Sequence, residues 1–466
     1  MDVNIPLAKK NRNFVVVGAN CLLLSCFFIS LSAALCLKGI LEGFNSINLY
    51  AAFVAIRSVE SALGMLIAGP LGNKYGRKKV LTILLPLEFA SALICGLSGN
   101  FVLFTVAINV LGIVNGTLMA TGYAIITDII EKPNLGKYFG YVATLVNIAM
   151  LGAPLIAGAL NDLGMASLTF LIPAPFILVS FLATIHSYQN KKFSDAPLDL
   201  VGFLLISLAI GCFLVTLSIG GVLVQWTDAP IFILLGIAIV SGVLTFRHFQ
   251  KVDNPILDFK IFKNKQFGQS NIFTALRIPV MTILTVNIIL YITTVLKMPN
   301  TAAGALSMPK TILTILLPSV FTAFIIKTKR KMFLLRYSFV VALVSCILLS
   351  VSFMLDLKYV FLMVTVAAAI SGVSESMQAV TLQPYALSTL DGKDLGSANS
   401  LTTFIPAVVS SVFTAFFGMI NNLAGGNSAV SLPIMAAIAL ACSIITVLIV
   451  FRVIPKDELH TKNEQI

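Results

Sequence analysis

Polar residues and Gly or Pro punctuation divide the chain into fourteen apolar segments, each close to the roughly 20 residues that a helix needs to cross a bilayer. Hydrophobic residues make up 58% of the 466 positions and charged residues only 11%, which excludes a soluble domain. We therefore predict an all-α integral membrane protein, and the even number of spans places both termini on one side. The segments begin near Phe14, Ile47, Val80, Phe101, Tyr138, Ser167, Leu198, Pro230, Gly268, Thr301, Met332, Lys358, Leu395 and Ser431.

Most basic residues lie in the connections between the apolar segments. The net charge is +12 with 31 Lys and Arg, and only Arg57, Arg277 and Lys310 fall within apolar segments. Three more lie in predicted outer loops, and the others lie in connections that we assign to the cytoplasm. This bias orients membrane proteins, so we predict cytoplasmic termini and exclude nucleic-acid binding.

The connection between the second and third segments, residues 69–79, holds three glycines and four cations. Such a basic turn is typical of the cytoplasmic side, and its glycines indicate that two helix ends approach closely and that the turn docks on neighbouring helices. A second basic run, residues 327–331, lies at the corresponding place in the other half. The correspondence predicts an internal repeat, which in membrane proteins is typical of transporters.

The repeat predicts a division of the chain into two helical bundles with an insertion between them. We expect a six-helix bundle in residues 1–190, two extra transmembrane helices in 191–250, a cytoplasmic linker in 251–267, a second six-helix bundle in 268–455 and a cytoplasmic tail in 456–466. The first apolar run is too long for a signal peptide, so we expect it to remain as a span.

The sequence carries no constellation that indicates catalysis or a bound cofactor. The seven cysteines include no CxxC pair, and the three histidines have no partner at the spacing of metal ligands. No GxxxxGK[ST] phosphate loop is present. We therefore expect no enzyme, no metal and no cofactor, and an ion or substrate gradient as the energy source.

Charged residues inside the first half are the first functional candidates, because an ionisable group in a span is costly unless it is paired or hydrated. Arg57 and Glu60 lie three residues apart on one helical face. They either form a structural ion pair or line a cavity in which Glu60 takes a proton or a cation. Glu88 has no cation within one turn, and is either a proton carrier or the partner of a cation on another helix, such as Arg57.

In the second half, Ser371, Glu375 and Gln378 follow the spacing i, i+4, i+7 and form one polar stripe in an apolar segment. The stripe is typical of a cavity lining or of a polar seam between helices. Arg277 is the candidate cation here, and it either holds an anionic substrate or neutralises Glu375. Each of these two roles has equal support from the sequence.

Two asparagines of the fourth segment, Asn109 and Asn115, can hydrogen-bond a substrate, although polar helix packing is the commoner use of such residues. Aromatic residues are weaker candidates for an apolar cavity, because in spans they usually face lipid or packing partners. They are Phe27, Phe28, Phe404, Phe416 and Phe417.

The turn at residues 69–79 resembles the loop signature of the major facilitator superfamily, in which a glycine and a leucine precede an acid, a cation and a Gly-Arg pair. Asn73 stands at the acidic position here and Lys74 at the cation. The resemblance implies a conformational role for the motif, carried by Gly69, Gly72, Asn73, Lys74, Gly76 and Arg77.

In the fifth segment, Gly152, Pro154 and Gly158 resemble the antiporter signature of the same superfamily, with Ala153 and Ala157 in place of glycines. Proline with small neighbours kinks a helix and permits close packing, which suits a moving interface.

Residues 199–202 and 254–267 resemble the fourteen-span drug:proton antiporter family, and the resemblance covers nearly the whole chain. It implies the major facilitator fold, with two six-helix bundles and two extra spans. It also implies proton-coupled efflux of amphipathic small molecules by alternating access, a multidrug activity associated with antibiotic resistance. The expected partners are a small-molecule substrate, protons and membrane lipid, for a monomer in a bacterial cell membrane.

The chain departs from the family pattern where proton coupling is expected. The first segment has no carboxylate, Asn115-Gly116 replaces a Gln-Gly pair, and Gly112 replaces an arginine. Together with Arg57 and Arg277 inside spans, these departures leave a second hypothesis open. It is an organic-anion facilitator or symporter that does not use the usual proton-coupling residues.

Overall fold

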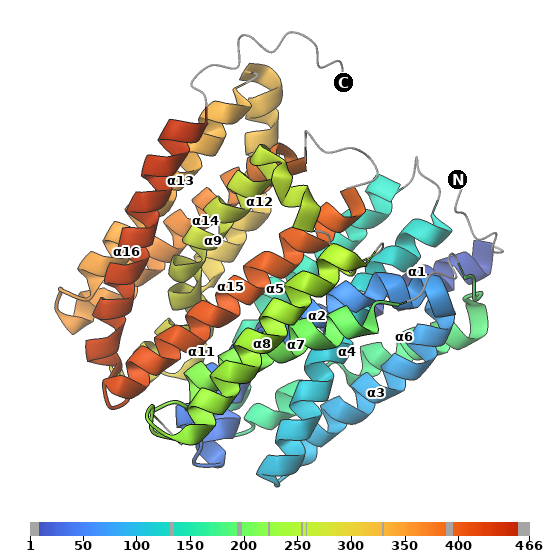
Figure 1. The fold of residues 1–466 in the computed structure, drawn as a ribbon, viewed down its shortest axis with the longest axis horizontal. Coiled ribbons are helices and arrows are strands. Elements are labelled where there is room, and N and C mark those ends of the chain that lie inside the picture. Colours follow the sequence, from blue (N-terminus) through green and yellow to red (C-terminus); the bar gives the residue numbers. More distant parts are fainter. Residues whose placement is uncertain are drawn as a thin grey trace. The chain divides into compact units, whose positions relative to one another are not determined.

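The computed structural model describes residues 9–130, 135–192, 198–221, 224–252, 255–257, 259–328, 330–387 and 395–454. Within these residues, fourteen helical segments are long and apolar enough to cross a membrane (Figure 1). They begin within a few residues of the predicted positions. The predicted all-α membrane fold is confirmed.

Contacts divide the chain into two compact units, residues 1–258 and 259–466. The boundary lies between the helix that ends at Lys251 and the short 3-10 helix that begins at Phe259. Each unit is described by itself below.

The first unit holds the helices from α1 to α8, coloured blue to green in Figure 1. They are α1 (Lys9–Gly43), η1 (Ile47–Leu49), α2 (Tyr50–Tyr75), α3 (Arg77–Leu97), α4 (Phe101–Ile129), α5 (Leu135–Asp162), η3 (Ala166–Phe170), α6 (Ala174–Ser187), α7 (Leu200–Ile219) and α8 (Ala229–Lys251).

The second unit holds the remaining helices, one of which changes to a π-helical turn in mid-span. They are η4 (Phe259–Lys263), α9 (Lys265–Thr282), the π-helix η5 (Ile283–Asn287), α10 (Ile288–Thr294), α11 (Asn300–Leu306), α12 (Met308–Thr328), α13 (Lys331–Ser352), α14 (Leu357–Leu387), α15 (Leu395–Leu423) and α16 (Ser428–Val453).

Polar side chains mark the starts of several helices. Asn100, Asp199, Asn264 and Asn427 each accept hydrogen bonds from backbone N–H groups in the first turn of α4, α7, α9 and α16. A cap satisfies donors that a helix cannot pair internally, which matters most where water is scarce. These positions explain why the spans begin where the polar punctuation predicts.

In the first unit, α2 and α4 lie against each other with almost no side chain between them. A Cβ added at Gly64 would overlap the backbone of Ile113, and one at Gly116 would overlap the backbone of Ser61. Small residues allow this approach, which is a main source of helix association in membranes. The two helices therefore form one closely packed pair, and α2 carries Arg57 and Glu60 within it.

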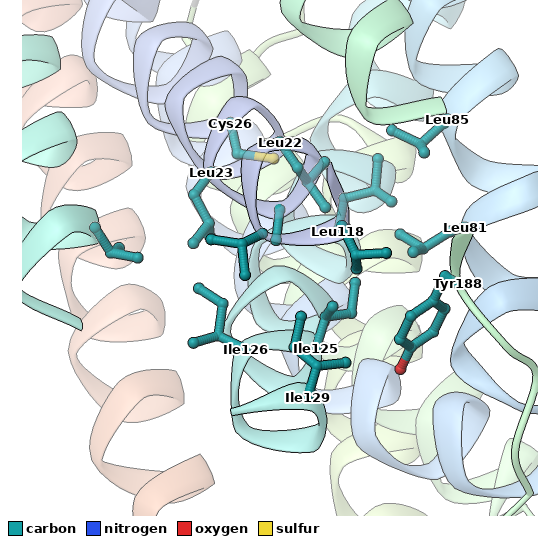
Figure 2. Close-up of a cluster of buried hydrophobic side chains, with 14 of the residues drawn as sticks. Leu22, Leu23, Cys26, Leu81, Leu85, Leu118, Ile125, Ile126, Ile129 and Tyr188 are labelled. Carbon is teal, nitrogen blue, oxygen red and sulfur yellow. The ribbon is translucent and has the colours of Figure 1, made fainter. Parts of the chain in front are cut away.

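Apolar side chains of α1, α3 and α4 fill the space beside this helix pair (Figure 2). Figure 2 shows Cys26 of α1 at one end of the cluster and Tyr188 at the other, with Leu118 of α4 between them. In the second unit a smaller cluster joins α9, α13, α14 and α16 through Phe273, Phe339, Leu382 and Val450.

Candidate functional site

Glu88 on α3 lies entirely inside the first unit, with a fully buried side chain. Its Oε1 accepts a hydrogen bond from Asn115 Nδ2 at 3.2 Å and faces the thiol of Cys26 at 3.8 Å. Its Oε2 is buried and has no hydrogen-bond partner among the described residues. The carboxyl group thus has one oxygen held by donors and one oxygen free to carry a proton.

Asn115 on α4 holds this carboxyl group in place. Its Oδ1 accepts a hydrogen bond from Ser30 at 2.9 Å, while its Nδ2 also approaches the carbonyl oxygen of Cys26 at 3.4 Å. One amide therefore links α1, α3 and α4, which is the helix-joining role that the sequence left open beside substrate binding. Cys26 and Ser30 lie on α1, and no pattern in the sequence singled them out.

Arg57 and Glu60 on α2 lie near Glu88, but they do not form the ion pair that their spacing allows. Arg57 Nη1 donates to the carbonyl oxygen of Ile108 on α4 at 3.3 Å. The guanidinium lies within electrostatic reach of both Glu60 and Glu88. Among the described residues neither carboxylate is within salt-bridge distance of it, and Glu60 Oε2 is buried without a hydrogen-bond partner.

Gly112 on α4 explains where the Glu60 side chain goes. A Cβ at Gly112 would overlap the Glu60 carboxylate, so the missing side chain makes room for that group. Gly112 stands where the family pattern has an arginine, and the space contains an acid from the neighbouring helix instead. We call Arg57, Glu60, Glu88 and Asn115 the carboxylate cluster.

The second unit contains an open cavity of about 490 Å³ between α9, α14 and α15. Its wall combines charged and polar groups with small and branched apolar ones. The lining residues are Ser270, Asn271, Thr274, Arg277, Glu375, Gln378, Ala379, Leu382, Ala386, Thr402 and Pro406. Arg277, Glu375 and Gln378, which the sequence singled out, therefore line one cavity.

Glu375 is paired with a residue to which the sequence gave no role. Lys310 Nζ on α12 lies 3.2 Å from Glu375 Oε1 and also contacts the thioether of Met281 at 3.3 Å. Ser371, the first residue of the polar stripe, is buried away from the cavity with its hydroxyl 3.7 Å from the same sulfur. The sequence feature that could have identified this partner is Lys310 itself, because it is a cation inside an apolar segment.

Arg277 lines the cavity without such a partner. The guanidinium interacts electrostatically with Glu375. Among the described residues it forms no hydrogen bond or ion pair, and its Nε is buried without a partner. Gln378 donates from Nε2 to Ser374 Oγ at 3.1 Å, and its Oε1 has no partner among the same residues. The cavity lining therefore holds one carboxylate, which is paired with Lys310, and one cation, Arg277, which has no such partner among the described residues.

Comparison with known proteins gives these features a family. The family model of the Major Facilitator Superfamily matches residues 16–414 of the chain. The chain belongs to the Major Facilitator Superfamily. It is a multi-pass membrane protein and a transporter, as predicted, and not an enzyme.

Two relatives illustrate which members of the superfamily it is similar to. Multidrug resistance protein 3 of Bacillus subtilis is 25% identical over 416 residues, which cover 88% of this chain and 80% of that protein. Multidrug export protein EmrB of Haemophilus influenzae is 23% identical over 359 residues, which cover 77% of this chain and 70% of that protein. The resemblance to drug exporters is confirmed.

Solved structures show the same fold. A POT family transporter crystallised with 5-aminolevulinic acid superposes with a TM-score of 0.71 at 11% identity, covering 94% of this chain and 96% of that chain. A peptide transporter POT in complex with sulfate has a TM-score of 0.70 at 15% identity, covering 96% and 95%. Identities this low establish the major facilitator fold and nothing about the substrate.

The superfamily's loop motif forms a tight turn between α2 and α3. Gly76 has φ of 86°, a conformation that favours glycine, and the Asn190 side chain occupies the space where a Cβ would lie. The Asn190 amide accepts from Lys79 N at 3.3 Å and donates to the Tyr75 carbonyl at 3.2 Å. The motif residues Gly69, Gly72, Asn73 and Lys74 lie in the last turns of α2.

An ion pair joins this turn to α4 even though Asn73 replaces the expected acid. Arg77 forms a salt bridge with Asp128 and donates to the carbonyl oxygen of Ala124 at 3.0 Å. The Tyr188 hydroxyl donates a hydrogen bond to Asp128 Oδ2 at 2.9 Å. Burial, together with the Asp128 carboxylate, raises the pKa of Tyr188, so the phenol stays a hydrogen-bond donor at physiological pH.

The remaining candidates are Asn109 and the three residues of the antiporter signature. Asn109 donates to the carbonyl oxygen of Thr105 on its own helix at 2.8 Å. Gly152, Pro154 and Gly158 lie within α5, which continues through the proline and packs against α1.

Proposed function

We propose that the chain exports amphipathic small molecules in exchange for protons, by alternating access. The observation that carries the proposal is the Glu88 carboxyl group, which is fully buried and has donors on only one of its oxygens. A buried ionisable group in a span is a functional candidate by default. Glu60, also buried with an unpartnered oxygen, supplies a second proton-binding group close to the same arginine.

The cavity of the second unit supports the substrate half of the proposal. A volume of about 490 Å³ lies in the range of small-molecule sites. Its mixture of Leu382, Pro406 and alanines with a few polar groups suits an amphipathic molecule. The names of the drug-exporting relatives point in the same direction.

The proposed working unit is a monomer in a bacterial cell membrane with both termini in the cytoplasm. The two six-helix sets, α1 to α6 and the six spans that follow residue 264, would act as the alternating bundles, with α7 and α8 as the extra pair. Protons and one small-molecule substrate are the only partners this scheme needs besides lipid.

The test uses purified protein in liposomes with an imposed pH gradient and a panel of anionic, neutral and cationic amphipathic dyes. Dye movement should follow the gradient and stop when the gradient is collapsed. Glu88→Gln should reduce gradient-driven transport at least tenfold, and Glu60→Gln should reduce it less. Asp356→Asn is the matched control, because this carboxylate is exposed in the short connection between α13 and α14.

Transport that is unchanged after collapse of the gradient contradicts proton exchange. Full transport by both Glu88→Gln and Glu60→Gln contradicts their assignment as proton carriers.

The second candidate function is an organic-anion facilitator or symporter. The cavity-lining Arg277 favours it, because the other charged residue of the lining, Glu375, is neutralised by Lys310. Dye movement down its own concentration gradient, without a response to pH on either side, distinguishes a facilitator from the exchanger.

A further inference from the structure

Two charged side chains, Arg277 and Glu375, line the cavity of the second unit, and Lys310 of α12, which is not part of the lining, neutralises Glu375. Lys310 contacts Glu375 at 3.2 Å, and the Met281 sulfur contacts the same ammonium group. Both side chains are largely buried, with 16% and 24% of their surfaces exposed, so the pair is held from two sides. It contributes no net charge to the cavity.

Arg277 is the charged group of the lining that this ion pair does not neutralise. A guanidinium offers five N–H donors, and no described protein group accepts from them. The side chain is partly buried on α9 and lines the cavity. A cation that lines a cavity and has donors unused by the protein can bind an anion through charge-assisted hydrogen bonds.

The neutral polar groups of the lining do not take this role. The hydroxyls of Ser270 and Thr274 donate to the carbonyl oxygens of Phe267 and Ser270, and the Asn271 amide donates to Phe267 as well. These hydrogen bonds all lie within α9 itself. Arg277 therefore dominates the electrostatics of the cavity, while Gln378 adds an acceptor without a partner.

We infer that this cavity binds amphipathic molecules that carry a single anionic group, such as a carboxylate or a sulfonate. The anionic group binds the Arg277 guanidinium, and the apolar body lies against Leu382, Ala386 and Pro406. A cationic molecule meets a net charge of +1 at the cavity and is disfavoured. The inference rests on the proposed function only in taking this cavity as the substrate site.

The experiment compares three dyes that share one aromatic body. Dansylglycine is a monoanion, dansylamide is neutral and dansylcadaverine is a cation. Fluorescence titration of the full-length protein in neutral detergent should give dansylglycine a Kd at least about tenfold lower than dansylamide, as a charge-assisted hydrogen bond predicts. Dansylcadaverine should bind more weakly than dansylamide.

Variants then assign the preference to Arg277. Arg277→Gln should bring the dansylglycine and dansylamide affinities together, while Arg277→Lys keeps part of the difference because the charge remains but the planar fork is lost. Glu375→Gln should strengthen dansylglycine binding, because Lys310 loses its counter-ion. Arg452→Gln, an exposed arginine at the end of α16, is the control and should keep the wild-type ratio.

Equal affinities of the wild-type protein for dansylglycine and dansylamide, or tighter binding of dansylcadaverine, overturn the inference without any variant. A preference that survives in Arg277→Gln overturns the assignment to Arg277. Displacement of dansylglycine by equimolar phosphatidylglycerol shows that the cavity takes a lipid head group and overturns a soluble substrate. These titrations need no pH gradient, so failure of proton exchange in liposomes leaves them unaffected.

Discussion

The carboxylate cluster of the first unit and the cavity of the second unit use the same charged groups in opposite ways. In the cluster, Arg57 donates to a backbone carbonyl, and within the described part of the chain Glu60 and Glu88 form no ion pair. In the cavity, Glu375 is paired with Lys310, and Arg277 has no ion pair with any residue that the structure describes. The carboxylate cluster is left with unpaired acids, which can take a proton. The cavity is left with an unpaired guanidinium, which can take an anion.

The largest expected difference between the sites concerns removal of a negative charge. Glu375→Gln leaves the largely buried Lys310 ammonium without its counter-ion, and we expect unfolding free energy to fall by about 2 kcal/mol, below the range for fully buried pairs because both groups are partly exposed. Glu88→Gln keeps the shape and removes an unpaired charge, so it should change stability by less than about 1 kcal/mol.

The measurement is unfolding in mixed detergent and dodecyl sulfate micelles. Lys310→Met should recover stability when it is added to Glu375→Gln, since the stranded cation is then absent. A larger loss for Glu88→Gln than for Glu375→Gln would reverse the comparison.

The second difference concerns the space available for added side-chain atoms at the α2–α4 contact and at the cavity wall. Gly116→Ala places a methyl group against the backbone of Ser61 in the α2–α4 contact and should cost about 2 kcal/mol, because backbone cannot move aside. Ala379→Leu adds more atoms but at an exposed position of the cavity wall, so it should cost less than about 0.5 kcal/mol.

Gly211→Ala, at a helical position with no atom within 4 Å of the added Cβ, is the control and should be neutral or slightly stabilising. The same unfolding assay decides the point. Equal losses for Gly116→Ala and Ala379→Leu would mean that the two sites are equally tightly packed.

The smallest difference concerns the two asparagines. Asn115→Ala removes the links to Ser30, Cys26 and Glu88 across three helices and should cost about 1.5 kcal/mol. Asn271→Ala removes one bond to Phe267 on its own helix beside an open cavity and should cost about 0.5 kcal/mol. Similar unfolding free energies for the two variants would show that the amide of Asn115 does not join the helices.

Hydropathy was sufficient to predict the spans, because a run of apolar residues long enough to cross a bilayer is a local and strong signal. It also placed Arg277, Glu375 and Gln378 as candidates, which now line one cavity. Partners could not be predicted in the same way. Arg57 and Glu60 have the spacing of a pair, yet Arg57 turns to the carbonyl oxygen of Ile108 on another helix.

The ion-pair partner of Glu375 could not be predicted from the sequence either. Its partner Lys310 lies 65 positions away in the chain, on α12. Each residue turns a helix by about 100°, so contact between two helices depends on rotations that spacing within one helix does not contain. The close α2–α4 approach likewise depends on Gly64 and Gly116 facing each other, which only the packed structure determines.

The π-helical turn at Ile283–Asn287 lies between Arg277 and the second half of the same span. A π turn holds one residue more than an α turn, so deleting one residue there would rotate α10 by about 100° relative to α9. Tyr291, whose ring now lies 5.3 Å from that of Phe353 between centroids, would lose this contact while Arg277 stayed in place. The span therefore consists of two helical pieces, and the extra residue of the π turn determines which side of α10 faces its neighbours relative to α9.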